Sequence, residues 1–125
     1  RADELVARFA NAAERRGVAL AGGGWDAVPA AFDVVINATA GSLQGDVPPL
    51  PAGVYAEGAL DYDMMYGAQP TVFMTHALAA GATRAADGLG MLVEQAAEAF
   101  AVWRGVRPST DAVRTALRAR LAAKG

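Results

Sequence analysis

The segment 32–39 constrains the fold more than any other part of the chain, because its apolar and β-branched residues follow one another almost without interruption. It reads Phe-Asp-Val-Val-Ile-Asn-Ala-Thr. A short continuous apolar run of this kind is typical of a strand that is covered on both faces, as in a parallel sheet. We therefore expect a buried strand here, with the polar groups of Asn37 and Thr39 at its carboxyl end.

The rest of the chain alternates between helical and extended patterns. Apolar spacing, capping residues and terminal glycines predict helices over 2–16, 70–81, 88–103 and 110–123. Extended segments are predicted over 18–20, 59–64 and 83–86, a helical turn within 25–31 and a loop over 41–53. The order helix, strand, strand, helix, strand, helix, helix is typical of an α/β fold. We expect Trp25 and Trp103 in the core and His76 partly buried in its helix.

Composition excludes several classes of function. Eleven basic against 13 acidic residues give a net charge of −2, which leaves no basic surplus for nucleic acid or anionic lipid. The absence of cysteine and the single histidine argue against a metal site. No apolar run approaches the roughly 18 residues that a membrane span requires, and no signal peptide is recognisable. We expect a cytoplasmic protein without a nucleic-acid or membrane partner.

The residues alone offer few catalytic groups. Asp61 and Asp63 share one face of a predicted strand, which suits acid–base or metal chemistry, but a solvated pair at a strand end is the simpler alternative. The glycines of 22–24 and 88–90 lack the G-x-G-x-x-G spacing, so the dinucleotide fingerprint is absent. No nucleophile–base pair is recognisable.

Two groups of residues suit ligand binding better. Asn37 and Thr39 end a predicted buried strand, and ligands of open α/β sheets bind beyond the carboxyl ends of strands. Gly88, Met91 and Gln95 form one stripe at the start of a predicted helix, where a glycine permits close approach of a cofactor to the backbone. Plain helix packing with Gln95 in solvent explains this stripe equally well.

Four segments together resemble shikimate dehydrogenase, the family that reduces 3-dehydroshikimate with NADPH. They are Val-Ile-Asn-Ala-Thr at 35–39, the tyrosine- and methionine-rich run with its following Pro-Thr at 62–73, Asp-Gly-Leu-Gly-Met-Leu-Val-Glu-Gln at 87–95 and Phe-Ala-Val-Trp-Arg-Gly at 100–105. Their order and spacing match over the whole chain. The resemblance implies that residues 1–125 are the C-terminal portion of a Rossmann-like NADP-binding domain, with helices from about 88 to 125 that return toward a substrate domain.

The resemblance also assigns roles to individual residues. Five residues are assigned to the cofactor NADP: Met64, Gly88, Asn37, Thr39 and Met91. Two are assigned to the substrate, shikimate or 3-dehydroshikimate: Tyr66 and Gln95. The glycine-rich phosphate loop and the catalytic lysine and aspartate of the family have no counterpart here, and we expect them in an upstream part of a longer chain. The opening at Arg1, directly before a helical pattern, agrees with that expectation.

The function that these expectations imply is reversible hydride transfer between NADPH and 3-dehydroshikimate, with the chain alone inactive. Two alternatives remain open: a non-catalytic α/β domain that binds a nucleotide or a protein, and a quinate/shikimate dehydrogenase relative. The segment that decides between NADP and NAD is expected upstream of Arg1. A homodimer is one oligomeric state open to the parent enzyme.

Overall fold

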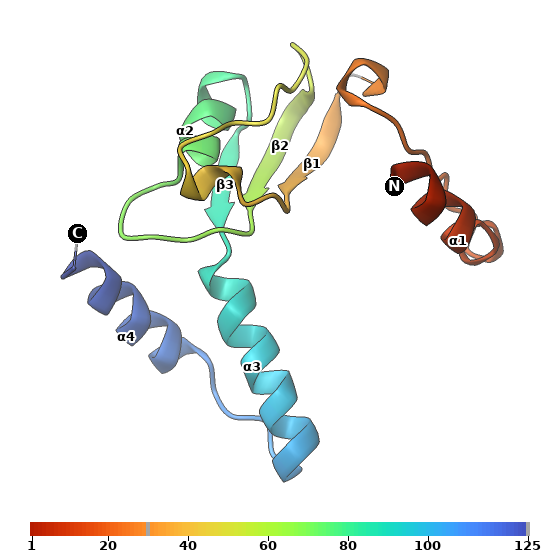
Figure 1. Cartoon of the computed structure of the whole chain (residues 1–125). Helices are drawn as coiled ribbons and strands as arrows, with labels where there is room; N and C mark the ends of the chain where they lie inside the picture. The colour runs from red at the N-terminus through yellow and green to blue at the C-terminus, as the bar shows by residue number, and fades with distance from the viewer. Residues whose placement is uncertain (30, 125) are drawn as a thin grey trace.

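The chain forms an α/β structure with a three-stranded sheet and four α-helices in its described part, as a computed structural model shows (Figure 1). The structure describes residues 1–29 and 31–124, without the side chain of Leu43. The α-helices are Ala2–Arg15 (α1), Val72–Ala79 (α2), Leu89–Arg104 (α3) and Asp111–Ala122 (α4). The strands are Phe32–Asn37 (β1), Tyr55–Asp63 (β2) and Arg84–Asp87 (β3), with 3-10 turns at Trp25–Ala27 (η1) and Gly41–Leu43 (η2). The predicted order of elements is confirmed.

The sheet is parallel throughout, in the order β1-β2-β3, which confirms the predicted fold class. Its register places Asn37 beside Asp63 and Asp63 beside Asp87, so that all three strands end on one line. The strand predicted to begin at 59 begins instead at Tyr55. Gly58 interrupts the apolar pattern there with φ +81°, in the part of β2 where its pairing with β1 shifts register.

The core lies between the sheet and α2. Thr71 begins this helix as predicted, because its hydroxyl accepts a hydrogen bond from the Met74 amide at 3.2 Å. Phe73 and Ala77 on α2 are buried, and the latter packs in a cluster with residues of β2 and the turn before β3. The other members of that cluster are Val54, Tyr55, Ala59 and Ala82.

The predicted cover on both faces of β1 is wrong for this chain. β1 is an edge strand, and its Val34 and Ile36 side chains are 50% and 61% exposed. The helix that packs on the sheet is α2, over β2 and β3, whereas α1 lies apart from the sheet and has no buried residue (Figure 1). The strand expected over 18–20 does not form, because no strand lies beside it among the described residues.

α3 and α4 form a hairpin that extends from the sheet (Figure 1). Gly105, at φ +73°, ends α3 in the left-handed conformation. Arg107 then pairs with Glu94 and Glu98 of α3 at 2.9 and 2.7 Å. Thr110 is the N-cap residue of α4, but its hydroxyl makes no cap bond and instead donates to Glu94 at 2.7 Å. This bond and that of Arg107 lower the pKa of the Glu94 carboxyl.

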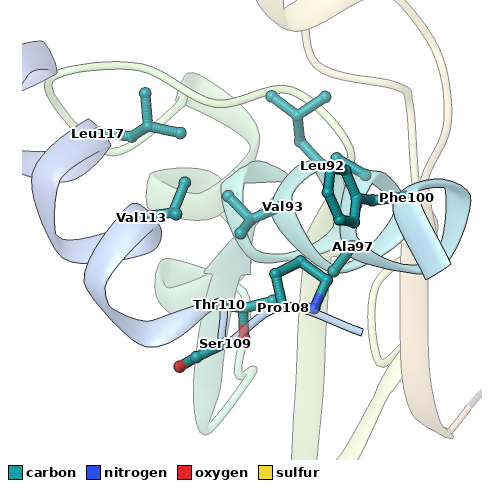
Figure 2. Close-up of a pocket in the computed structure, with 10 residues that line it drawn as sticks. Leu92, Val93, Ala97, Phe100, Pro108, Ser109, Thr110, Val113 and Leu117 are labelled. Atoms are coloured by element: carbon teal, nitrogen blue, oxygen red, sulfur yellow. The ribbon is translucent and has the colours of Figure 1, made fainter. Parts of the chain in front are cut away.

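An apolar hollow of about 360 Å³ lies between these two helices (Figure 2). Leu92, Val93 and Phe100 line it from α3, and Val113 and Leu117 line it from α4. Its residues therefore mark the face of α3 that is turned toward α4. Farther along α3, Trp103 is 78% exposed, and Trp25 on η1 is 48% exposed, so the prediction of both tryptophans in the core is wrong.

Candidate functional site at the carboxyl edge of the sheet

The three strand ends form one edge, which we call the carboxyl edge and define by Asn37, Asp63 and Asp87. Each is the last residue of its strand, and they are register partners across the sheet. Ligands of open parallel sheets bind outside such an edge. The carboxyl edge is therefore the candidate site.

Asp63 connects the segments around this edge. Its carboxylate is fully buried and accepts four hydrogen bonds. The donors are Asn37 Nδ2 at 3.3 Å, Ser42 Oγ at 2.7 Å, Met65 N at 3.1 Å and Thr71 Oγ1 at 2.6 Å. They come from β1, η2, the loop after β2 and the start of α2, so one carboxylate fixes four segments relative to one another.

Asn37 is 3% exposed, and its amide is fully used inside the protein. Its Oδ1 accepts from the amide and the hydroxyl of Thr39, at 3.0 and 2.8 Å. Its Nδ2 donates to Ser42 and to Asp63. Asn37 therefore shapes the edge and holds the exposed Thr39 beside it, but its side chain has no free donor for a ligand.

Met64 and Gly88 are brought into direct contact. Met64 N donates to Asn37 O, and Gly88 N donates to Met65 O, both at 3.0 Å. A Cβ at position 88 would overlap the carbonyl oxygen of Met64 and would lie 2.6 Å from its carbonyl carbon. The φ of Gly88 is an ordinary −74°. A glycine is required here by the close approach of two backbones, which no local sequence pattern predicts.

Met91 and Gln95 lie on the other side of α3 from the hollow. Their helical offset from Leu92, Val93 and Phe100 turns them away from α4. Met91 is half-buried and Gln95 is exposed. Tyr66, two residues after Met64, is 40% exposed on the loop between β2 and α2. The structure thus brings Asn37, Thr39, Met64 and Gly88 together, and it leaves the Tyr66, Met91 and Gln95 side chains outside the hydrogen-bond network of the edge.

Arg118 is a residue that the sequence did not single out. Its guanidinium makes two hydrogen bonds of 2.7 Å to the carboxylate of Asp87 and one of 3.2 Å to the carbonyl of Gly67. Asp87 also accepts from the Leu89 amide at 3.3 Å, although the N-cap residue of α3 is Gly88. The partners of Arg118 are 31 and 51 residues away, so no local pattern could have revealed them.

Asp61 lies two residues before Asp63 and is also fully buried, so the predicted solvated pair is wrong. Tyr55 donates to Asp61 Oδ1 at 2.9 Å, while Oδ2 has no partner among the described residues. Burial raises the pKa of Asp61 to about 6, helped by the charge of Asp63 and opposed by the Tyr55 hydrogen bond and His76. Burial also raises the pKa of Tyr55. His76 itself is exposed rather than partly buried, because its side of α2 is turned away from the core.

Within 1–29 and 31–124, no three His, Asp or Glu side chains are grouped as a metal ion would need. In the same residues, no helix has the length and apolar character needed to cross a bilayer.

A parallel sheet with the helical crossover α2 between β2 and β3 and a polar carboxyl edge defines this chain as part of a Rossmann-like α/β domain. Residues 88–118 match the family model described as the shikimate 5'-dehydrogenase C-terminal domain. By sequence and fold, the chain corresponds to the C-terminal part of the shikimate dehydrogenase family, as the resemblance implied.

Individual relatives give the extent of this match. The chain is 57% identical to a shikimate dehydrogenase (NADP(+)) of Cupriavidus pinatubonensis, over 99% of this chain and 44% of the relative. It is 54% identical to that of Bordetella avium, again over 99% and 44%. The chain therefore spans less than half the length of these curated relatives.

Solved structures agree in fold. A shikimate dehydrogenase in complex with NADP+ superposes with a TM-score of 0.72 at 26% identity, over 96% of this chain and 44% of that one. The enzyme of Thermus thermophilus, in complex with NADP(H) and shikimate, gives a TM-score of 0.64 at 30% identity, over 91% and 42%.

Proposed function

We propose that this chain is the C-terminal, cofactor-side part of an NADP-dependent shikimate dehydrogenase, which reversibly transfers a hydride between NADPH and 3-dehydroshikimate to give shikimate. The observation that carries the proposal is the carboxyl edge, where three strand ends bring Met64, Gly88, Asn37 and Thr39 into one connected group. The names of the relatives supply the nucleotide and the substrate.

The edge fits a negatively charged dinucleotide. The oxygens of Asp63 are satisfied by four neutral donors in the interior, and the charge of Asp87 is paired with Arg118. A phosphate-bearing cofactor therefore meets no exposed, unpaired carboxylate there. In the proposal, Met64 and Gly88 hold NADP through their backbones, Met91 offers its polarizable thioether near the nicotinamide, and Asn37 and Thr39 shape the cleft. When bound, NADP supplies the hydride donor or acceptor.

Substrate binding is assigned to the exposed side chains of Tyr66 and Gln95. A phenol and an amide donate to and accept from the hydroxyls and carboxylate of shikimate. The face of α3 that carries Gln95 is turned away from α4, and we propose that this face returns toward the substrate domain. The catalytic lysine and aspartate implied by the resemblance are assigned to that domain. The proposal places the enzyme in the cytoplasm with a small molecule as its partner.

The test is the oxidation of shikimate by the 125-residue chain and by the full-length enzyme, each with NADP+ and with NAD+. We expect activity with NADP+ in the full-length enzyme and none in the chain alone, because hydride transfer needs both halves of the site in register. A preference of the full-length enzyme for quinate would favour the quinate/shikimate relative. Inactivity on both substrates would contradict the enzyme and favour a non-catalytic binding domain.

A further inference from the structure

Arg118 joins α4 to two segments that carry proposed ligand residues. Through Asp87 it reaches the junction of β3 and α3, where Gly88 lies, and through Gly67 it reaches the loop that carries Tyr66. These partners come from separate parts of the chain, and a single guanidinium connects them.

The connection is rigid at its Asp87 end. Two parallel N–H···O bonds of 2.7 Å form a planar fork, which fixes the orientation of the guanidinium as well as its position. The Asp87 side chain is only 11% exposed and is also held by the Leu89 amide. The fork to Asp87 therefore also fixes the direction of the N–H group that Arg118 donates to Gly67 O.

The Tyr66 loop has few other restraints at this point. Before Tyr66, Met65 is held on both sides, by Asp63 and by Gly88. After it, the next hydrogen bond to the edge comes from Thr71. Over residues 66–70, the bond from Arg118 to Gly67 is the only hydrogen bond that joins the loop to the rest of the described chain.

We propose that Arg118 is a positioning residue that fixes the Tyr66 loop for substrate binding without touching substrate or cofactor. The inference rests on the proposed function of Tyr66. A loop that is already ordered loses less conformational freedom when a ligand binds, so affinity rises without a new contact. On the cofactor side, Met64 N is bonded to Asn37 O and Gly88 N to Met65 O, so these backbone bonds remain when the fork to Asp87 is removed, and this side depends less on Arg118 than the Tyr66 loop does.

The test compares three variants of the full-length enzyme. Arg118→Ala removes the fork, Arg118→Lys keeps the charge without the fork, and Arg114→Ala is the control. Arg114 lies one turn earlier on α4, is similarly exposed and pairs with Asp111 within its own helix. We expect Arg118→Ala to raise the KM for shikimate about three- to tenfold, with smaller changes in kcat and in the KM for NADP+. Arg118→Lys should recover part of this loss, and Arg114→Ala should match the wild type.

Limited proteolysis by chymotrypsin, which cleaves after tyrosine, gives a second measurement that needs no activity. We expect faster cleavage after Tyr66 in Arg118→Ala and unchanged cleavage in Arg114→Ala. Unchanged cleavage and KM in Arg118→Ala would overturn the inference. Equal rises in both Michaelis constants together with a lower melting temperature would also overturn it, since they indicate general destabilisation. A wild-type enzyme inactive on shikimate would instead overturn the proposed function, and the cleavage rates would still show whether Arg118 orders the loop.

Discussion

Asp61 and Asp63 are two buried carboxylates on the same face of one strand, yet their surroundings differ sharply. Asp63 accepts four hydrogen bonds, from a side-chain amide, two hydroxyls and a backbone amide. Asp61 accepts one, from Tyr55, and its second oxygen has no partner among the described residues. At the strand end, the loops supply donors, whereas two residues deeper only neighbouring side chains are within reach.

The comparison separates two contributions of a buried carboxylate. At the carboxyl edge it links the segments of the candidate site, because every bond that it accepts fixes another element. In the interior the same group is costly, since a buried oxygen without a partner loses its hydration and gains nothing in return. Substitutions in the full-length enzyme should therefore change both stability and ligand binding at the edge, and stability alone at Asp61.

The largest effect is expected for Asp63→Ala. Its removal leaves donors of Asn37, Ser42, Thr71 and Met65 without their acceptor, and we expect a loss of about 4 kcal/mol in unfolding free energy. Urea unfolding measures it. Asp63→Asn is the control, because it keeps one acceptor oxygen and should lose less. A loss below about 1 kcal/mol for Asp63→Ala would contradict the linking role.

Gly88→Ala should come next, with a loss of about 2–3 kcal/mol. The new Cβ would overlap the Met64 carbonyl, so the backbone of one of the two segments must move. Gly90→Ala is the matched control on the same helix, because a Cβ there meets nothing within 4 Å. Since alanine favours the helix, Gly90→Ala should be neutral or stabilising by up to about 1 kcal/mol. Equal melting temperatures for the two variants would show that the contact carries no strain.

Local signals in the sequence predicted the elements well. Gly17 ends α1 at φ +63°, with the Val18 amide bonded to Ala13 O at 3.0 Å, as the C-terminal glycine motif requires. Thr71 caps α2, and Gly105 ends α3. Each of these contacts joins residues within one turn or loop, where the order of residues alone determines which groups can meet.

The sequence did not reveal what depends on partners far along the chain. Trp103 and Val34 are apolar, but their exposure is decided by which elements pack over them. The fork between Arg118 and Asp87 and the close approach of Gly88 to Met64 have no local pattern at all. For the candidate site, the residues and their roles are therefore predictions from the family resemblance, whereas the network that positions them required the structure.

Asp61→Asn should stabilise the protein, whereas Asp63→Ala is expected to destabilise it. The pKa of Asp61 is about 6 in the folded protein against an ordinary 3.8, so below about pH 4 the group is protonated in both states and costs nothing. The cost grows from pH 4 to 6 and is complete above that range, at up to about 3 kcal/mol. Asparagine carries no charge but leaves both N–H donors of its amide unpaired, so we expect a net gain of at most about 1 kcal/mol at pH 8.

The pH dependence is the sharper part of that experiment. Thermal unfolding at pH 8 should favour Asp61→Asn, and the difference should vanish or reverse at pH 4. The kinetic parameters should stay at wild-type values, because Asp61 has no contact with the edge residues proposed to hold ligands. A gain that is the same at both pH values would show that ionisation of Asp61 is not its cause.

The smallest change in stability is expected at Gln95, which lies outside both carboxylate environments. Its side chain is exposed on the α3 face turned away from α4, so Gln95→Ala should leave the melting temperature unchanged. Because Gln95 is assigned to the substrate, the loss of one or two hydrogen bonds should cost about 1–3 kcal/mol in transition-state binding, lower kcat/KM for shikimate accordingly and leave the KM for NADP+ unchanged. Met91→Ala, one helical turn earlier, should show the opposite pattern because its thioether is assigned to the cofactor. Steady-state kinetics with each substrate varied in turn measures both effects. If Gln95→Ala changes the KM for NADP+ alone, this face of α3 binds the cofactor and not the substrate.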